Sequence, residues 1–370
     1  MTHSQRRHNL STQIVAKGLD AMLVTDLVNV RYLTGFTGSN GALLLFADDR
    51  EPVLATDSRY RTQAAEQAVG LEVAIDRACG RHLVARAAEG GVGRLGFESH
   101  VITVDGLDAL TGALDGKNTQ LVRASGSVEA LREVKDAGEL ALLRLACEAA
   151  DAALTDLIDR GGLRPGRTER EVSRELEALM LDHGADALSF ETIVATGPNS
   201  AIPHHRPTDR ALATGDFLKI DFGALVAGYH SDMTRTFVLG SAADWQLELY
   251  QLVAEAQKAG REALRPGAGL REVDGAARQL IADAGYGEQF GHGLGHGVGL
   301  QIHEAPGIGA TSAGTLLGGS VVTVEPGVYL PGRGGVRIED TLVVAHGTSQ
   351  TAGQTPELLT RFPKELAILT

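Results

Sequence analysis

Acidic residues stand at matching places in two similar segments of this chain, each after a short apolar run. The segment GDFLKIDFG aligns with GSVVTVEPG, which places Asp221 opposite Glu325. Further along each copy, GYHSD aligns with GVRIE, which places Asp232 opposite Glu339. A carboxylate at the end of a buried strand is costly unless it is paired or bound to a metal. Four carboxylates that converge in this way would need cations.

Histidines gather in a glycine-rich stretch between the two copies of the acidic pattern. The stretch GHGLGHGVGLQIHEAP contains His292, His296 and His303. Glycines let the backbone and the imidazoles approach a cation closely, because they carry no side chain. We expect at least one of these histidines to bind metal and the others to donate hydrogen bonds to a substrate. His204 in NSAIPHH is a further candidate, whereas the adjacent His205 is expected to take no part.

One arginine accompanies the acidic set. Residues two apart on a strand point to the same face, so Arg337 and Glu339 are expected to lie side by side. Arg337 would then hold a carboxylate, either by steadying Glu339 in an ion pair or by contacting a substrate, and the two roles are compatible.

The candidate ligands are mostly oxygen donors, with one imidazole among them. Such donors suit a pair of hard or borderline divalent ions such as Mn²⁺, with Co²⁺ or Zn²⁺ as alternatives, and they exclude a cysteine-rich structural zinc site. Two ions about 3.5 to 4 Å apart would polarise a carbonyl and lower the pKa of a bridging water. Hydrolysis is therefore the predicted reaction class.

The acidic segments belong to a longer internal repeat. Residues 163–184 match residues 264–285 at ten of twenty-two positions, and both copies begin with LRPG. Each copy has the pattern of a Pro-Gly turn, an amphipathic helix and a glycine stop. We expect two related halves whose pseudo-two-fold arrangement brings the four carboxylates together.

The first part of the chain has a different pattern. The runs AMLVTDLVNVRYLTGF, GALLLFADD, EPVLATD and RLGFESHVITV are expected to be strands, and a helix is expected after Asp57. A polar stretch precedes a long helical pattern that starts at Val128. We therefore predict an α/β domain over residues 1–127 and a second domain over residues 128–370.

Composition narrows the class of partner and the location. The formal net charge is −13, with no basic stripe, which argues against binding to nucleic acid or to anionic membranes. No apolar run approaches the roughly 20 residues that cross a bilayer. Only Cys79 and Cys147 occur and no secretory signal is recognisable, so we expect a cytoplasmic protein without disulfides, with Cys147 in a helical core. GVGRLG spells a dinucleotide-binding fingerprint, but it leads into a strand, and we attribute it to chance.

At these residues the sequence resembles the metal-dependent pita-bread peptidases, in particular their aminopeptidase P and prolidase branch. The resemblance rests on VATGPNSAIPHH, LKIDFGALVAGYHSDMTRTF, GHGLGHGVGLQIHEAP, VVTVEPGVYL and GVRIED, in that order, and on NVRYLTGFTGSNG near the amino terminus. It spans nearly the whole chain. It implies an α+β protein whose carboxy-terminal catalytic domain is a duplicated pita-bread fold and whose smaller amino-terminal α/β domain is creatinase-like.

The resemblance also implies roles for individual residues. Two metal ions would be held by five side chains: Asp221, Asp232, His296, Glu325 and Glu339. Of these, Asp232 and Glu339 would bridge both ions. Three histidines would contact the scissile carbonyl or the proline side of the substrate and help to move the proton, namely His204, His292 and His303. Arg337 would steady the site or the substrate, and Glu325 would accept a proton from the attacking water.

The implied activity is hydrolysis of an Xaa-Pro bond at the amino terminus of a peptide. We expect an Xaa-Pro aminopeptidase, with an Xaa-Pro dipeptidase (prolidase) restricted to dipeptides as the alternative. The two differ in whether anything beyond a dipeptide fits, and loops that close the far end of the cleft would decide. On the resemblance alone we expect a homodimer, in which Tyr32, Asn40 and the residues between them could complete a partner's cleft.

Three rivals within the same fold are weaker. Methionine aminopeptidases share the five ligands but typically lack an amino-terminal domain of this size. Creatinase shares the two-domain plan without the metal ligands. A non-catalytic pita-bread binding module would have eroded ligand positions, whereas all five are filled here.

Overall fold

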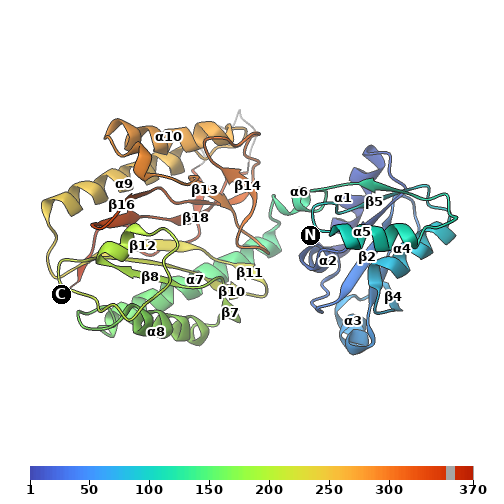
Figure 1. Cartoon of the computed structure of the whole chain (residues 1–370), viewed down its shortest axis with the longest axis horizontal. Helices are drawn as coiled ribbons and strands as arrows, with labels where there is room; N and C mark the ends of the chain where they lie inside the picture. Colours follow the sequence, from blue (N-terminus) through green and yellow to red (C-terminus); the bar gives the residue numbers. More distant parts are fainter. Residues whose placement is uncertain (347–354, 370) are drawn as a thin grey trace. The chain divides into compact units, whose positions relative to one another are not determined.

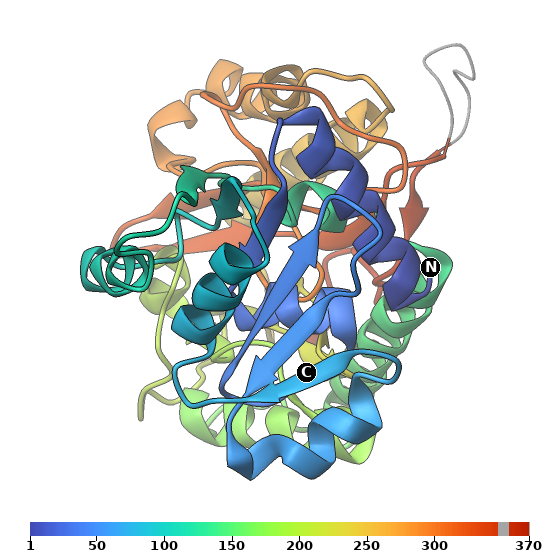
Figure 2. The ribbon, with the colours of Figure 1, turned by 90° about the vertical axis from the view of Figure 1, so that its right-hand side faces the viewer.

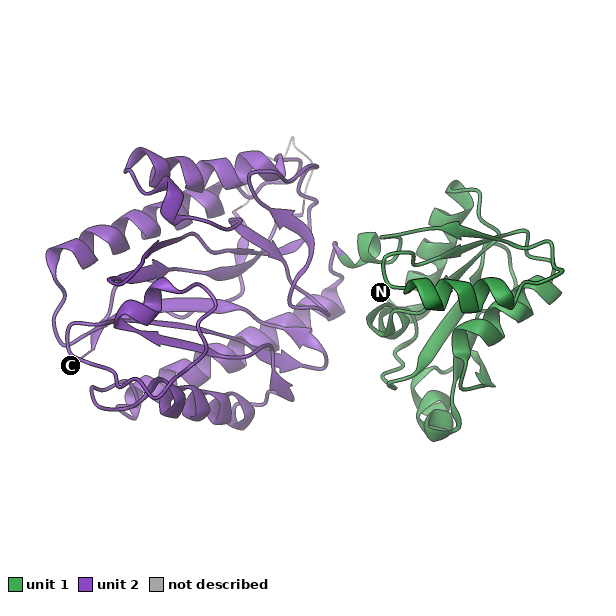
Figure 3. Cartoon of the chain, viewed as in Figure 1, with its two compact units in different colours: residues 1–132 green, residues 133–370 purple. Residues whose placement is uncertain are grey.

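The chain folds into two compact units, which Figure 3 distinguishes by colour. The computed structural model describes residues 1–346 and 355–369. One unit comprises Met1–Arg132 and the other comprises Glu133–Thr370. The predicted boundary at residues 127 and 128 falls before the short helix α6 (Glu129–Arg132), which clusters with the first unit.

The amino-terminal unit is built on a six-stranded mixed sheet of order β4-β3-β2-β1-β5-β6. The strands are β1 (Ala21–Val24), β2 (Gly41–Phe46), β3 (Val53–Thr56), β4 (Glu72–Ile75), β5 (Arg94–Phe97) and β6 (Gln120–Arg123). The helices before α6 are α1 (His3–Ala16), α2 (Leu27–Thr34), η1 (Ser58–Tyr60), α3 (Arg61–Gln67), α4 (Cys79–Glu89) and α5 (Val104–Gly112). Strand β2 pairs antiparallel with β1 and β3, and the other pairs are parallel. Figure 2 shows this sheet with helices against it.

Two of the predicted strands are in part helical. The run that starts at Ala21 is a strand only to Val24, because Asp26 then caps helix α2 by accepting hydrogen bonds from the backbone N–H groups of Val28 and Asn29. Gly35 ends that helix in the left-handed conformation, with φ of 83°. Likewise RLGFESHVITV is a strand only over Arg94–Phe97, and helix α5 begins after Thr103.

The carboxy-terminal unit places its strands between two pairs of helices (Figure 1). The first pair is α7 (Ala137–Asp159) and α8 (Glu169–Asp182), and the second is α9 (Asp244–Ala263) and α10 (Leu270–Asp283). Apolar side chains of each pair pack against the strands that follow it in sequence, so each half has its own core cluster. Within the described residues, no helix is both long and apolar enough to cross a bilayer.

The strands of this unit form one sheet in each half, with smaller sheets beside them. In the first half they are β7 (Ala187–Leu188), β8 (Ile193–Thr196), β9 (Phe217–Phe222), β10 (Ala224–Val226), β11 (Tyr229–His230) and β12 (Met233–Leu239), with η2 (Gly197–Ala201) after β8. In the second half they are β13 (Gly295–Gly297), β14 (Glu304–Ile308), β15 (Val321–Val324), β16 (Gly327–Leu330), β17 (Gly334–Arg337), β18 (Asp340–Val343) and β19 (Glu357–Leu358), with η3 (Gly287–Gln289) before β13. The last strand, β20 (Ile368–Leu369), pairs in parallel with β12 and so joins the sheet of the first half. Strand β9 lies between β8 and β12, and β15 lies between β13 and β18, so each half centres on an apolar strand that leads to a carboxylate.

The repeat in the sequence is repeated in the backbone. The N–H of Gly166 donates to the carbonyl oxygen of Leu212 over 2.8 Å, and at the matching position Gly267 donates to Leu316 over 2.8 Å. Two isolated bridges, Thr168 with Ala211 and Gly269 with Thr315, also occupy matching positions. The two halves therefore fold in the same way locally, as the duplicated sequence predicts.

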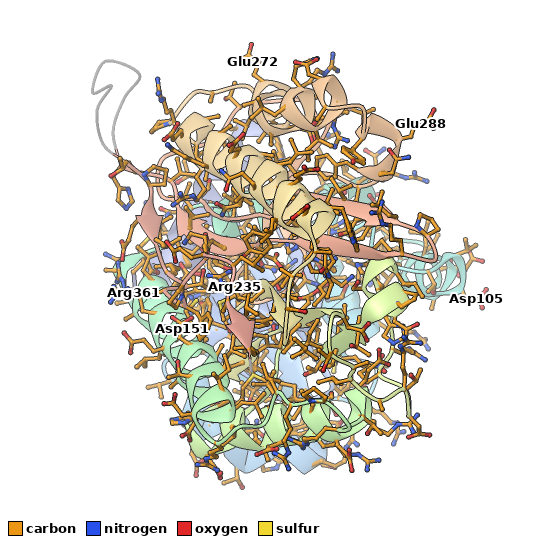
Figure 4. The ribbon with its side chains drawn as sticks, turned by 90° about the vertical axis from the view of Figure 1, so that its left-hand side faces the viewer. Asp105, Asp151, Arg235, Glu272, Glu288 and Arg361 are labelled. Atoms are coloured by element: carbon orange, nitrogen blue, oxygen red, sulfur yellow. The ribbon has the colours of Figure 1, made fainter. Side chains whose placement is uncertain are left out.

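A carboxy-terminal segment is fastened onto the first half. Asp151 of α7 accepts hydrogen bonds from the backbone N–H groups of Arg361 at 2.7 Å and Phe362 at 3.1 Å. Buried Arg235 of β12 donates through Nη2 to the carbonyl oxygen of Phe362 at 2.7 Å. Figure 4 shows Asp151 beside Arg361, with Arg235 further inside the unit.

Cys147 and the segment GVGRLG lie where the sequence predicts. Cys147 is fully buried in α7 and Cys79 is buried at the start of α4, and neither forms a disulfide. GVGRLG leads into β5. Its glycines therefore do not open a helix, as a dinucleotide site would require.

Candidate metal centre

Four carboxylates from both halves of the carboxy-terminal unit line one cavity. Asp221 lies in β9 and Asp232 directly before β12, while Glu325 follows β15 and Glu339 directly precedes β18. The cavity has a volume of about 340 Å³, and all four side chains contribute to its wall. The structure thus brings together the acidic residues that the aligned segments predict.

The closest cluster joins the two halves through one imidazole. Asp232, His296 and Glu339 each offer one ligand atom, and these atoms lie within 4.8 Å of one another. His296 Nε2 lies 3.5 Å from Asp232 Oδ2 and 3.4 Å from Glu325 Oε1. These atoms are the donors that a divalent ion would take.

Glycines on both sides of His296 allow this approach. A Cβ on Gly295 would lie 2.0 Å from the carbonyl oxygen of Thr323, and a Cβ on Gly297 would lie 2.1 Å from that of Ala305. Any side chain at either position would push β13 away from its neighbouring strands. The glycine-rich sequence is therefore required for close strand packing around the imidazole.

The carboxylates are electrostatically unfavourable when alone. Burial, followed by the charges of Glu339, Asp221 and Glu325, raises the pKa of Asp232 well above its ordinary value. Burial raises the pKa of Glu339 well above its ordinary value too, with the charges of Glu325 and Asp221 adding to it. The pKa of Glu325 is raised to about 8, mainly by burial. Cations would remove this penalty, because they compensate the negative charge that burial disfavours.

Two further observations fit a bound metal. Burial lowers the pKa of His296 to about 4, so its imidazole is neutral at physiological pH and its lone pair is available to a metal. Asp221 Oδ1 is buried and, within residues 1–346 and 355–369, has no hydrogen-bond partner. A buried carboxylate oxygen without a hydrogen-bond partner is rare unless an ion or a water molecule binds to it.

Arg337 reaches the acidic set in a way that differs from the simplest expectation. Its Nη2 donates to Asp221 Oδ2, so the direct ion pair is with Asp221 and not with its neighbour Glu339. Its Nε donates to Thr234 Oγ1 at 3.0 Å, and that hydroxyl donates to Glu339 Oε2 at 2.6 Å. Arg337 therefore steadies one carboxylate directly and a second through a threonine. It also lines the cavity, where a substrate would lie.

The other three candidate histidines line the cavities beside the four carboxylates. His303 lines the same cavity, and its ring centroid is 4.4 Å from that of His296. His292 lines an adjacent cavity of about 470 Å³, and its Nε2 is 2.9 Å from the hydroxyl of Tyr329. His204 lines both cavities, so it stands where they meet. Burial, with the nearby charge of Arg337, lowers the pKa of His292 to about 4, which keeps that ring neutral.

Some residues near the cavity were not predicted. His205 was expected to take no part, yet it is buried, lines the cavity and donates to Glu169 Oε2 at 2.8 Å. Lys219 is fully buried and donates to the carbonyl oxygens of Ile202 and Pro203. A lysine inside the apolar strand FLKIDF was a visible signal, because a charged residue there needs buried partners. Tyr329 accepts a hydrogen bond from Arg337 Nη1 at 2.8 Å, but nothing in its sequence context predicted this contact.

Comparison with protein-family descriptions assigns both units. Residues 141–346 match Metallopeptidase family M24, and residues 6–134 match the Creatinase/Prolidase N-terminal domain. These ranges together cover most of the chain and include every candidate ligand.

Individual relatives match over nearly their full length. The solved structure of an Xaa-Pro dipeptidase from Bacillus anthracis is 40% identical, covers 100% of both chains and superposes with a TM-score of 0.92. An Xaa-Pro dipeptidase from Pyrococcus horikoshii is 35% identical over 91% of this chain and 93% of its own. The structure of an X-Pro aminopeptidase from Thermotoga maritima is 32% identical, covers 98% of this chain and 99% of its own, and has a TM-score of 0.87. With its converging carboxylates, its single central imidazole and full-length relatives of this kind, the chain belongs to metallopeptidase family M24 and carries a creatinase/prolidase amino-terminal domain.

Proposed function

We propose that this protein is an Xaa-Pro dipeptidase that uses two divalent metal ions. The sequence favoured an Xaa-Pro aminopeptidase, with the dipeptidase as the alternative. The relatives named above favour the alternative, because two of the three are called Xaa-Pro dipeptidases. The observation that carries the proposal is the convergence of carboxylates from both halves on His296, in a cavity large enough for a dipeptide.

The metal ligands are proposed to be the five side chains that meet at the cavity. These are Asp221, Asp232, His296, Glu325 and Glu339. Four carboxylates and one imidazole are hard or borderline donors, which suits Mn²⁺ best, with Co²⁺ or Zn²⁺ as alternatives. When bound, such a metal pair supplies an electrophile for the scissile carbonyl and lowers the pKa of the attacking water.

The remaining chemistry falls to side chains of this chain. Glu325 accepts the proton of the attacking water, because its carboxylate lines the cavity beside the other proposed ligands and is ionised when metal is bound. His204 and His303 line the cavity and donate to the carbonyl oxygen or hold the proline ring. His292, together with Tyr329, supports the adjacent wall. The ion pair with Arg337 holds the Asp221 carboxylate in place, where it would bind a metal ion and the α-amine of the substrate.

The leaving nitrogen of an Xaa-Pro bond sets one requirement. The leaving nitrogen of any hydrolysed peptide bond must gain a proton, and proline nitrogen, which carries no N–H in the bond, leaves as a secondary amine. A neutral histidine cannot give up a proton as readily as an imidazolium ion, so we propose that the proton held by Glu325 is delivered to this nitrogen. Glu325 then first accepts the proton of the attacking water and afterwards donates it to the proline nitrogen.

An Xaa-Pro aminopeptidase is the second candidate. It is supported by the likeness to the X-Pro aminopeptidase from Thermotoga maritima and by the second cavity, which adjoins the first at His204, His296, Glu325 and Arg337. Space beyond a dipeptide would favour longer substrates. A homodimer, with the segment that begins at Tyr32 and ends at Asn40 closing a partner's cleft, remains part of the proposal. Light scattering on the purified protein measures its oligomeric state.

Turnover of three substrates tests the function. Purified protein with Mn²⁺ should hydrolyse an Xaa-Pro dipeptide, and it should act far more slowly on an Xaa-Pro tripeptide and on a longer peptide that begins with Xaa-Pro. Chelation should abolish turnover. Comparable rates on all three substrates would assign an aminopeptidase, and activity that survives complete chelation would contradict the metal site.

A further inference from the structure

We propose that Glu169 and His205 form a positioning pair that holds His204 against the cavity. This inference deepens the proposed function and rests on it, because His204 acts on the substrate of the same reaction. Neither Glu169 nor His205 would touch the substrate's reacting atoms. They would act by fixing the residues 196–208, which we call the His204 segment.

Glu169 gathers hydrogen bonds from the whole length of this segment. The carboxylate is fully buried in the first turn of α8. Its oxygens accept from five donors at 2.6 to 2.9 Å: Thr196 N, Asn199 Nδ2, His205 Nε2, Thr208 N and Thr208 Oγ1. Bonds to an ionised acceptor are stronger than neutral ones, and these five come from both ends and the middle of the segment.

His205 transmits this anchoring to its neighbour. Its side chain is buried and its Nε2 reaches Glu169 Oε2 at 2.8 Å, while His204 is exposed and lines both cavities. Residues 202–208 belong to no helix or strand, so backbone ladders do not order them. The position of the His204 ring must therefore come from side-chain contacts such as this one.

A second anchor holds the other side of His204. Lys219 Nζ donates to the carbonyl oxygen of Ile202 at 2.6 Å and to that of Pro203 at 3.2 Å. Arg337 Nη1 donates to the same Pro203 carbonyl at 3.3 Å. The His204 segment is thus held by the buried carboxylate of Glu169 and by the buried side chains of Lys219 and Arg337. Anchors at two points of the segment restrict its backbone more than either would alone.

A cycle of variants tests the role of His205. We expect His205→Ala to lower kcat/KM for an Xaa-Pro dipeptide about 10- to 100-fold, because a displaced catalytic group loses its alignment. His205→Gln should recover much of this loss, since its amide can still donate to Glu169. In a His204→Ala background, His205→Ala should have little further effect, because the residue that it positions is already gone. His183→Ala is a matched control, since this half-exposed histidine pairs with Asp156 away from the cavity.

Hydrogen exchange gives a readout that does not depend on turnover. The amides of residues 196–208 should exchange faster in His205→Ala and in Glu169→Gln than in the unchanged protein, while those of β9 stay protected. Losses that add fully in the double variant, or unchanged exchange over the segment, would overturn the inference. If the unchanged protein fails to cleave any Xaa-Pro peptide, the proposed function fails, but the exchange measurement still decides whether the pair positions His204.

Discussion

His296 Nε2 lies 3.5 Å from Asp232 Oδ2, and this contact joins the second half of the carboxy-terminal unit to the first. Neither half holds the candidate site alone, because Asp221 and Asp232 come from one copy of the repeat and Glu325 and Glu339 from the other. The acidic cavity therefore depends on the duplication, because each copy of the repeat supplies two of its four carboxylates. The duplication also explains why each of these carboxylates lies near others of like charge.

The first prediction concerns Asp232→Asn. Loss of this central carboxylate should lower kcat/KM at least about 100-fold, since even outer-shell changes cost 10- to 100-fold at metal sites. In the metal-free protein the same change should raise Tm, because burial and the charges of Glu339 and Asp221 raise the pKa of Asp232, so that its carboxyl must take up a proton on folding, whereas Asn is neutral already. Steady-state kinetics on an Xaa-Pro dipeptide measure the first effect, and circular dichroism melts of the metal-free protein measure the second. Asp105→Asn, an exposed position in α5, should change neither.

The second prediction concerns pH and metal together. The pKa of Glu325 in the metal-free protein is raised from 4.5 to about 8, chiefly by burial, with Asp221 adding to the rise and Arg337 opposing it. Between these values the folded protein holds a proton that the unfolded chain has lost, so the free energy of unfolding should fall as pH rises. Asp232 and Glu339 shift in the same direction.

Metal binding should reverse this loss. Ligand carboxylates must be ionised to bind, so Mn²⁺ should release protons and should raise Tm more at about pH 8 than at about pH 6. Titration calorimetry in two buffers of different ionisation enthalpy measures the number of protons released. A buffer-independent heat, with an equal Tm shift at both pH values, would contradict the charge state assigned to this cluster.

The third prediction concerns the buried ion pair behind the site. Arg235 Nη2 and Asp340 Oδ1 are 2.8 Å apart, with side chains 1% and 0% exposed, and Arg235 also donates to the carbonyl oxygen of Glu339. Arg235→Met leaves Asp340 partly uncompensated, so the free energy of unfolding should fall by about 3 to 5 kcal/mol. Urea unfolding measures this change. Arg160→Met removes an exposed pair with Asp156 and should cost less than about 1 kcal/mol.

The sequence predicted the acidic ligands well because their signal is local and repeated. An apolar strand that leads to a carboxylate can be read twice in this chain, at Asp221 and at Glu325, and the structure places both residues at one cavity. The roles of these residues as metal ligands remain a prediction. Helix α2 was mistaken for strand because its apolar residues suit either element, and only the cap at Asp26 and the left-handed Gly35 separate them.

The parts that the sequence did not reveal depend on long-range contacts. Glu169 meets His205 across thirty-six residues of sequence, and Arg337 meets Asp221 across one hundred and sixteen. Adjacent histidines in PHH cannot show which ring is buried and which faces a cavity, because no periodic element contains them. Such assignments need the tertiary fold, whereas the strands can be predicted from the local sequence pattern alone.

The last prediction concerns the glycine that precedes His296. A Cβ at Gly295 would lie 2.0 Å from the carbonyl oxygen of Thr323, so Gly295→Ala must push β13 away from β15 and move the imidazole with it. We expect weaker Mn²⁺ binding by calorimetry and a loss of about 100-fold in kcat/KM, as for a reactive group misplaced by about 1 Å. Gly275→Ala is the matched control, because a Cβ there meets nothing within 4 Å. In the middle of α10 that change should stabilise the protein by about 0.5 to 1 kcal/mol and leave metal binding unchanged. Equal metal affinity in the two variants would show that close packing at β13 does not set the position of His296.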